Sequence, residues 1–438
     1  MRRELEKDLL SWKERQRRYP LLLRGARQVG KTYVIEQLGK HFETFEMVNF
    51  ESQPEAIACF ETLKAQEIVQ KLELLTKRPI RSGKTLLFLD EIQNCPKAIT
   101  ALRYFKEDLP DLHVIGAGSL LEFALIHGKF SFPVGRVQFV YLKPLSFKEF
   151  SIAIGLGRED LENCTVENPL SEPEHLAWIQ RAREYFFVGG MPAVVSEYSM
   201  TKSFLETHRI QDLLLATYAA DFGKYATEAE QKYLRLAFDS IPRQIGKQFQ
   251  YSEIDPHMRS RELKYAIEQL QWAGIIHTTL ASSATGIPLA AQQKRNRFKP
   301  IFLDIGLAQR ALRVDSEKIF HSDLIQINAG ALAEQFVGQE FLAYADFFRE
   351  EQLFFWEREK KGSSAEVDYV ITVGSQIIPV EVKAGPHGHL KSLSQFMQEK
   401  KSPLGIRISQ KPLSFDGNVL SVPLYMIDQI PRLCLRMI

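Results

Sequence analysis

Cysteine is scarce in this chain of 438 residues, and its four copies lie far apart, at Cys59, Cys95, Cys164 and Cys434. No two of them form a Cys-x-x-Cys pair, so their spacing excludes a zinc knuckle and a disulfide framework. Long apolar runs are also missing. The longest, residues 185–195, is interrupted by two glycines and a proline and is too short to span a bilayer. The first residues lack the apolar core of a signal peptide. These absences predict a soluble cytoplasmic protein.

An excess of charge of either sign is absent as well, since 56 Lys and Arg side chains stand against 54 Asp and Glu, a net charge of +2. Overall charge therefore indicates no nucleic-acid or membrane partner, and any nucleic-acid surface must come from local patches. A hydrophobic content of 45% is typical of soluble globular proteins, and the length predicts several domains. We expect four of them, with boundaries at residues 1–150, 151–232, 233–312 and 313–438.

The most specific motif is a glycine-rich segment that fits Gly-x-x-x-x-Gly-Lys-[Ser/Thr] and follows the apolar residues 21–23. Its members are Gly25, Ala26, Arg27, Gln28, Val29, Gly30, Lys31 and Thr32. Such glycines let backbone N–H groups surround phosphate oxygens, and a helix that begins near Gly30 adds the positive end of its dipole. We expect Lys31 to reach the β- and γ-phosphates of a nucleotide and the Thr32 hydroxyl to bind Mg²⁺.

A second Gly-Lys-Thr sequence, at residues 83–85, provides an internal comparison. Arg78 stands five positions before Gly83, where the motif requires glycine, and apolar strand residues follow it instead of a helix. We interpret this second copy as a turn.

Short β-rich runs alternate with helical patterns up to about residue 142, which predicts a parallel sheet flanked by helices. The expected strands cover residues 21–24, 45–49, 86–90, 113–116 and 138–142. The third strand ends in Asp90 and Glu91, where acidic residues belong in this architecture. Asp90 is expected to hold Mg²⁺ through water, and Glu91 to polarise the water that attacks the γ-phosphate. A solvated strand end is the alternative.

Two polar residues near later strands are further candidates. Ser119 follows the fourth strand and can contact both the attacking water and the γ-phosphate, or it can cap the helix that starts at Leu120; the two roles are compatible. Arg136 precedes the fifth strand and is a candidate to contact the γ-phosphate of its own or a neighbouring subunit, with a surface ion pair as the alternative.

These motifs, with Gly118 and the segment Leu142-Lys143-Pro144-Leu145-Ser146-Phe147, resemble one branch of the AAA+-type P-loop ATPases. In that branch the ATPase domain is joined to a C-terminal domain of unknown function. The resemblance covers nearly the whole chain, and it implies a sheet ordered 5-1-4-3-2, ATP and Mg²⁺ as cofactors, and hydrolysis of ATP to ADP and phosphate. Residues 189–192 and Asp221 also look like features of this family, but we assign no chemistry to them.

The third domain has the sequence outline of a winged helix. Its third helix begins at Ser260, ends before Gly274, and leads into a β-ribbon. Basic residues fall on the exposed side of this helix and on the ribbon: Arg259, Arg261 and Lys264, and the segment Lys294-Arg295-Asn296-Arg297-Phe298-Lys299. In a winged helix these are the positions where DNA phosphates would be bound. The alternative is a solvated surface, as in winged helices that contact only protein.

The C-terminal domain combines an amphipathic helix from Gly330 with strands expected at residues 354–356, 366–371 and 377–383. Because side chains alternate along a strand, Glu381 and Lys383 share one face. Asp368 is expected beside Glu381 across the hairpin. Asp368 and Glu381, with Glu334 from the helix, are candidate Mg²⁺ ligands, and Lys383 is a candidate to stabilise a pentavalent phosphate.

This pattern resembles the PD-(D/E)xK nuclease fold, although its proline-led form is replaced here by Glu366-Val367-Asp368. The predicted fold class is therefore α/β, a P-loop NTPase followed by helical, winged-helix and PD-(D/E)xK-like α/β domains. The corresponding function is ATP hydrolysis that drives or gates a DNA-directed activity of the C-terminal half, with a Mg²⁺-dependent nuclease as the candidate activity. The alternative is a non-catalytic, nucleotide-gated scaffold whose last two domains bind protein partners.

Overall fold

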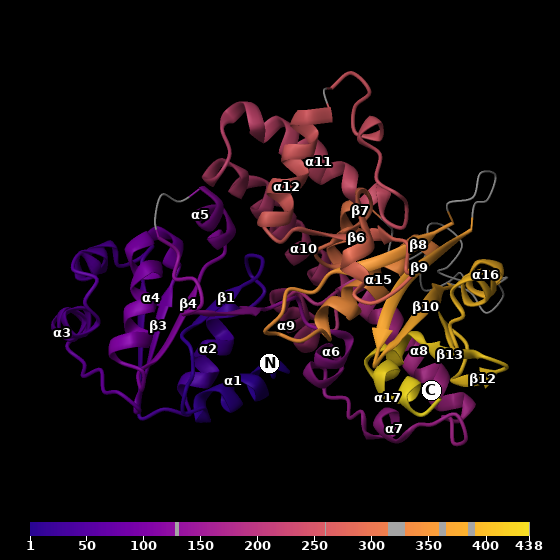
Figure 1. Ribbon diagram of the computed structural model, residues 1–438, viewed down its shortest axis with the longest axis horizontal. Helices are drawn as coiled ribbons and strands as arrows, with labels where there is room; N and C mark the ends of the chain where they lie inside the picture. The colour runs from indigo at the N-terminus through magenta and orange to yellow at the C-terminus, as the bar shows by residue number, and fades with distance from the viewer. Residues whose placement is uncertain (128–130, 259, 314–328, 359–364, 384–389, 438) are drawn as a thin grey trace.

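The structure, a computed structural model, describes residues 1–127, 131–258, 260–313, 329–358, 365–383 and 390–437. Its strands form two sheets, one of five strands and one of eight. In Figure 1 the five-stranded sheet lies at the left and the eight-stranded sheet at the right, with helices α11 and α12 above. None of the described helices is both long and apolar enough to cross a membrane.

The five-stranded sheet is entirely parallel, in the order β2-β3-β4-β1-β5. Its strands are β1 (Leu21–Arg24), β2 (Thr44–Asn49), β3 (Thr85–Asp90), β4 (His113–Ala117) and β5 (Gln138–Tyr141). Read from the other edge this order is 5-1-4-3-2, so the predicted topology is confirmed. Each strand begins and ends within one residue of its predicted bounds. Gly83 and Lys84 of the second Gly-Lys-Thr lie in a turn, as expected, and Thr85 begins β3.

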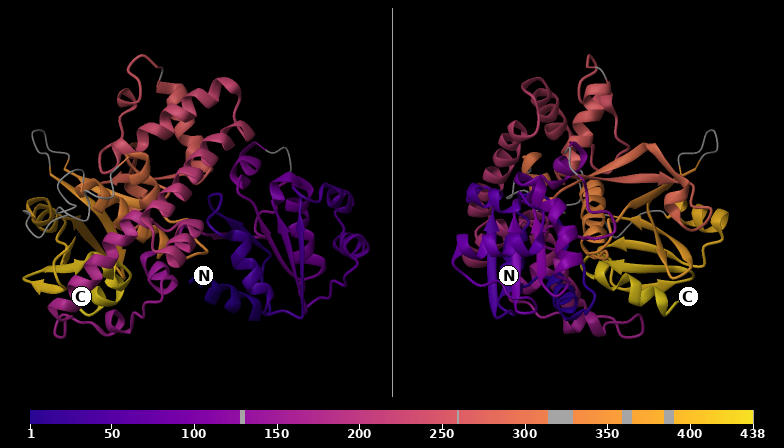
Figure 2. Two further views of the ribbon diagram at one scale, coloured as in Figure 1. Left: turned by 180° about the vertical axis from the view of Figure 1, so that it is seen from behind. Right: turned by 60° about the vertical axis from the view of Figure 1, so that its left-hand side comes forward.

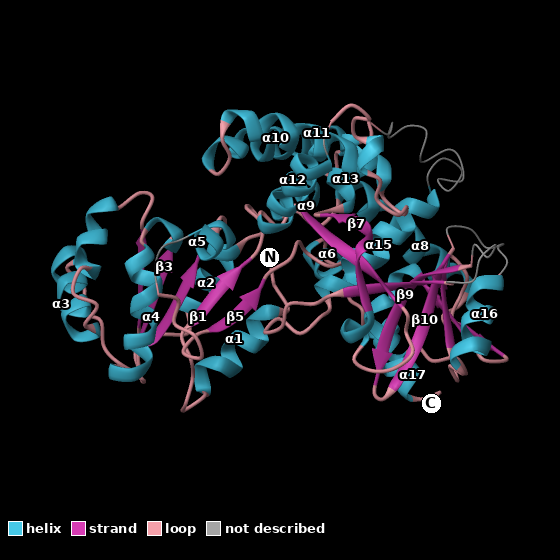
Figure 3. Ribbon diagram, turned by 45° about the horizontal axis from the view of Figure 1, so that its top comes forward, coloured by secondary structure: helices cyan, strands magenta, loops and turns pink. Residues whose placement is uncertain are grey.

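Helices cover both faces of this sheet (Figure 3). They are α1 (Leu5–Glu14), α2 (Lys31–Gly39), α3 (Ala65–Thr76), α4 (Pro96–Asp108) and α5 (Leu121–His127), with the 3-10 helices η1 (Pro54–Phe60) and η2 (Ile92–Asn94). Alternation along β1 divides the core. Leu21 and Leu23 pack with residues of α1 and α2, whereas Leu22 packs with residues of α3 and α4. The loop between β1 and α2 follows the carboxyl end of β1. Because the sheet is parallel, the carboxyl ends of the other strands lie at the same end of the sheet.

The middle of the chain is mainly helical. Its helices are α6 (Phe147–Ala153), α7 (Glu159–Asn163), α8 (Glu172–Val188), α9 (Pro192–Thr201), α10 (Phe204–Asp221), α11 (Glu228–Gln244), α12 (Ser260–Trp272) and α13 (Ile305–Ala311). Short 3-10 helices lie between them, namely η3 (Phe222–Lys224), η4 (Tyr251–Glu253) and η5 (Leu289–Gln292). Seen from behind, helices of this region run between the two sheets (Figure 2).

The eight-stranded sheet is mixed and has the order β12-β13-β11-β10-β9-β8-β6-β7. Its strands are β6 (Ile276–Ser282), β7 (Gln293–Phe302), β8 (Leu353–Glu357), β9 (Glu366–Val373), β10 (Gln376–Val382), β11 (Gly405–Ser409), β12 (Ser414–Asp416) and β13 (Val419–Pro423). The C-terminal helices are α15 (Ala329–Ala343), α16 (Lys391–Lys400), η6 (Leu424–Gln429) and α17 (Ile430–Leu435).

The β6–β7 ribbon, predicted as the wing, is part of this sheet. β6 pairs in parallel with β8, with Thr279 opposite Leu353. One sheet thus continues across the boundary predicted at residue 312, and the three boundaries between the four predicted domains stay predictions. Of the basic residues predicted to meet DNA, Arg259 and the side chain of Arg295 lie outside the described residues.

Candidate functional site

The glycine-rich loop has a backbone that only particular residues can adopt. At Gly25, where φ is 147°, a Cβ atom would lie 2.3 Å from the carbonyl oxygen of Leu142, so glycine is required. Gln28 and Gly30 also have positive φ, at 63° and 93°. The loop therefore curls tightly over the start of α2, which begins at Lys31.

Lys31 turns its ammonium into the loop. Its Nζ donates hydrogen bonds to the carbonyl oxygens of Gly25 at 2.9 Å and Ala26 at 2.8 Å. Burial lowers the pKa of Lys31 to about 8. Hydrogen bonds between charged partners are stronger than those to neutral carbonyls, so a nucleotide phosphate is the better partner for this ammonium.

Asp90 ends β3 directly beside this loop. Its Oδ2 accepts hydrogen bonds from the Thr32 hydroxyl at 3.1 Å and the Asn49 amide at 3.2 Å. Burial, and then the charge of Glu91, raise the pKa of Asp90. An adjacent hydroxyl and carboxylate are oxygen ligands of the kind that Mg²⁺ prefers, so Thr32 and Asp90 fit the ion that accompanies ATP. That ion would neutralise charge on the phosphates.

Glu91 follows Asp90 in a left-handed conformation, with φ 48°. Its Oε2 accepts a hydrogen bond from Gln93 Nε2 at 2.6 Å and another from the Ser119 hydroxyl at 3.4 Å. A Cβ atom on Gly118 would lie 1.9 Å from Gln93 Oε1, so glycine permits this approach. The structure brings Ser119 to the carboxylate predicted to activate water.

Arg136 lies away from the glycine-rich loop and from Glu91. Its Nε donates to Glu107 Oε1 at 2.9 Å, and nearly half of its side chain is exposed. Because β1 and β5 are parallel, with Leu21 opposite Gln138, Arg136 is at the end of the sheet opposite the loop. It cannot reach a phosphate of its own chain without a large rearrangement. Contact with a neighbouring subunit stays a prediction.

The loop is also held from outside the sheet. Arg27 Nη1 donates to both carboxylate oxygens of Asp221 in α10, at 2.5 and 2.7 Å, and the Tyr218 hydroxyl donates to the Arg27 carbonyl oxygen at 2.7 Å. From the N-terminus, Arg3 Nη1 donates to the Val29 carbonyl oxygen at 2.8 Å. The sequence marked Asp221 only as a family-like feature, because nothing in one sequence pairs it with a residue 194 positions away.

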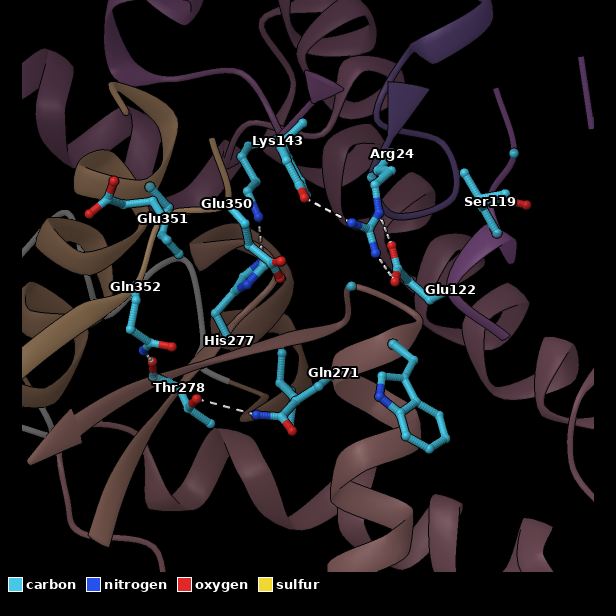
Figure 4. Close-up of a pocket in the computed structure, with 18 residues that line it drawn as sticks. Arg24, Ser119, Glu122, Lys143, Gln271, His277, Thr278, Glu350, Glu351 and Gln352 are labelled. Atoms are coloured by element: carbon cyan, nitrogen blue, oxygen red, sulfur yellow. Dashed lines mark hydrogen bonds and ion pairs between the residues drawn. The ribbon is translucent and has the colours of Figure 1, made fainter. Parts of the chain in front are cut away.

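A polar cavity of about 460 Å³ borders Gly25 and Ser119 (Figure 4). On one side Arg24 forms an ion pair with Glu122 and donates to the Tyr141 hydroxyl at 2.8 Å. On the other, Lys143 Nζ lies 3.1 Å from His277 Nε2 in β6. Burial lowers the pKa of Lys143 to about 8. The cavity is thus walled both by strands β1 and β5 of the first sheet and by β6 of the eight-stranded sheet.

The C-terminal candidates are brought together as predicted from the hairpin. Asp368 Oδ2 accepts a hydrogen bond from the Val382 N–H at 2.7 Å, and Lys383 Nζ lies 2.6 Å from Glu381 Oε1. Burial is the main cause that raises the pKa values of Glu334, Asp368 and Glu381, the last to about 7.

Lys299, which was predicted to contact DNA phosphates, lies in the middle of these acids. Lys299 of β7 is 4% exposed, and its Nζ lies 3.1 Å from Glu334 Oε2, 2.5 Å from Glu366 Oε1 and 3.7 Å from Asp368 Oδ1. Its prediction as a phosphate contact on the ribbon was wrong, because β7 is joined to the sheet and turns this side chain inward. Within the described residues, no three or more His, Cys, Asp or Glu side chains are grouped to hold a metal ion. Mg²⁺ does not fit this cluster while Lys299 stands there.

Three family models match separate parts of the chain. Residues 17–151 match an AAA domain, residues 179–318 a domain of unknown function (DUF8612), and residues 329–426 a second domain of unknown function (DUF4143). Residues 17–151 form a P-loop ATPase domain. The third match agrees with the predicted C-terminal domain of unknown function, but it does not show a nuclease fold. No curated protein matches the chain.

Among solved structures, a Walker-type ATPase of Pyrococcus abyssi is 17% identical, with a TM-score of 0.44, covering 72% of this chain and 96% of that one. A RuvB variant of Thermotoga maritima is also 17% identical, with a TM-score of 0.29, over 63% of this chain and 88% of that one. A signal-transduction ATPase with a tetratricopeptide-repeat sensor from Pyrococcus horikoshii is 14% identical, with a TM-score of 0.25, over 76% and 44%. Similarity at this level is too distant to carry a function from those proteins.

Proposed function

We propose that the chain is an ATP-hydrolysing switch whose nucleotide state is transmitted to its middle and C-terminal regions. Lys31 binds the phosphates, Thr32 and Asp90 bind the accompanying Mg²⁺, and Glu91 activates the attacking water with Ser119 and Gln93 beside it. The arrangement of Thr32 with Asp90 and of Ser119 with Glu91 supports these roles.

The observation that carries the transmission is the ion pair between Arg27 and Asp221. Arg27 belongs to the loop that would enclose the phosphates, whereas Asp221 ends α10. Asp221 also lies 3.6 Å from Lys224 Nζ. The γ-phosphate of an incoming ATP would compete with the Asp221 carboxylate for Arg27 and Lys224. ATP binding would therefore loosen the end of α10 from the loop.

Asp221→Asn is expected to tighten ATP binding roughly 5- to 10-fold, about 1 kcal/mol, because the anion that competes for Arg27 is removed. In the same variant, ATP should no longer change hydrogen exchange of α10. Asp212→Asn is the matched control, since Asp212 lies on the same helix and pairs with Arg310 at 2.6 Å, away from the loop. Titration with ATP and hydrogen-exchange mass spectrometry provide the measurements. Unchanged affinity and exchange in Asp221→Asn would contradict the transmission.

For the output of the switch, a DNA-directed role is the first candidate. Arg261 and Lys264 are exposed on α12, the predicted recognition helix, which supports contact with phosphates. The second candidate is a scaffold that binds protein. It is favoured by Lys299, whose position among the acids argues against metal-dependent cleavage of DNA.

Replacing both Arg261 and Lys264 by Glu is expected to weaken DNA binding at least 10-fold in a gel-shift titration, and to reduce the salt dependence of binding by about two phosphate contacts. Replacing Lys232 and Arg235, which are exposed on α11, is the matched control. If the unmodified chain shifts neither single- nor double-stranded DNA and its ATPase ignores added DNA, the scaffold is the better candidate.

A further inference from the structure

We propose that Lys299 is the resident cation of the C-terminal acidic cluster, and that its ammonium stands where the PD-(D/E)xK-like arrangement would place a divalent metal ion. The cluster then holds β7 to α15 and β9, and the chain does not cleave DNA through it. This inference is independent of ATP hydrolysis.

Lys299 Nζ contacts carboxylates from two separate elements, Glu334 of α15 and Glu366 and Asp368 of β9, and its side chain is almost completely buried. The ring of Phe355 in β8 lies 5.4 Å from Nζ, which adds a cation–π contact on another side. A metal ion that bridged Glu334 and Asp368 would need the same space.

Four carboxylates, Glu334, Glu366, Asp368 and Glu381, share the site with the ammonium groups of Lys299 and Lys383. The nearby Lys383 reaches only Glu381 among these carboxylates in the described structure, and Oε2 of Glu381 is buried without a hydrogen-bond partner there. Without Lys299, the remaining oxygens would form the hard, negatively charged environment that binds Mg²⁺ or Mn²⁺.

The raised pKa of Lys299 agrees with this geometry. Burial alone would lower it, but the charges of Glu334, Asp368 and Glu366 outweigh burial and keep the side chain an ammonium. An ammonium that remains charged at every physiological pH repels a divalent cation from the same carboxylates.

Lys299→Met tests the inference, since Met keeps the length and removes the charge. Mn²⁺ binding to the full chain is measured without nucleotide by electron paramagnetic resonance and by thermal shift. The variant is expected to bind one more Mn²⁺ than the wild type, at least roughly 10-fold more tightly than any wild-type binding at this cluster. The additional ion should be lost in the double variant Lys299→Met with Asp368→Asn.

Lys383→Met is the matched control, because it removes one positive charge from the same cluster but leaves Lys299 in place; it should gain no ion. If Lys299→Met does not fold, wild type and Asp368→Asn are compared directly, and equal Mn²⁺ binding supports the inference. Wild-type Mn²⁺ binding that Asp368→Asn removes would overturn it. So would Mg²⁺-dependent nicking of DNA by the wild type that Asp368→Ala and Lys383→Ala abolish.

Discussion

Lys31→Ala is expected to weaken ATP binding at least about 100-fold and to abolish detectable hydrolysis. Lys31 is buried, and its ammonium already lies inside the loop, bonded to the carbonyl oxygens of Gly25 and Ala26. Its loss therefore removes the cation that would contact the phosphates. Truncation of one partner of a buried charged pair costs about 3 kcal/mol, which corresponds to that factor. Titration with a fluorescent ATP analogue and a phosphate-release assay measure the two effects.

The chain supplies its own control for this experiment. Lys84 belongs to the second Gly-Lys-Thr sequence, is half exposed, and pairs with Glu43 at 2.9 Å. Lys84→Ala should leave ATP binding and hydrolysis unchanged. Equal ATP affinity in Lys31→Ala and the wild type would remove the assignment of the loop as the phosphate site.

Glu91→Gln is expected to slow hydrolysis roughly 100- to 10,000-fold while ATP affinity stays within a few-fold of the wild type. The amide keeps the size of the side chain and the contact with Gln93 or Ser119, but it cannot accept a proton from the attacking water. Single-turnover hydrolysis and an ATP titration separate the two quantities.

Glu61→Gln serves as the control for Glu91, because Glu61 is more than half exposed and pairs with Lys97 at the surface. Its hydrolysis should equal that of the wild type. Hydrolysis at the wild-type rate in Glu91→Gln would show that another group activates the water. Loss of ATP binding in that variant would instead indicate a structural role for this carboxylate.

Most of the ATPase domain was predictable because its signals are local. The loop requires glycines at fixed positions, and each strand is a short apolar run bounded by turn residues, so residues 21–142 predict the strands themselves. The order of the strands is not a local property and came from the family resemblance. The pairing of Asp90 with Thr32 follows from parallel strands, whose carboxyl ends meet at one edge. The same rule puts Arg136, which precedes β5, at the end of the sheet opposite the loop, so the predicted parallel sheet already disfavours its contact with a phosphate of its own chain.

Contacts between segments far apart in the chain could not be predicted from the sequence. Asp221 and Lys299 are each an ordinary charged residue in their own segment, and only folding brings one to Arg27 and the other to Glu334 and Asp368. Alternation along β7 indicates that Lys299 differs in orientation from its neighbours, but not that a sheet continues on that side.

The sequence by itself determined the phosphate loop, the strands of the first sheet, the acidic residues at the end of β3 and the hairpin that brings Asp368 to Glu381; the order of the strands came from the family resemblance. The tertiary structure decided what surrounds them: α10 holds the loop through Asp221, and the β6–β7 ribbon places Lys299 among the C-terminal acids. The physical reason is that the conformation of a loop, a strand or a hairpin depends on residues close in the chain. The partner of a buried charge depends instead on which segments the fold packs against it.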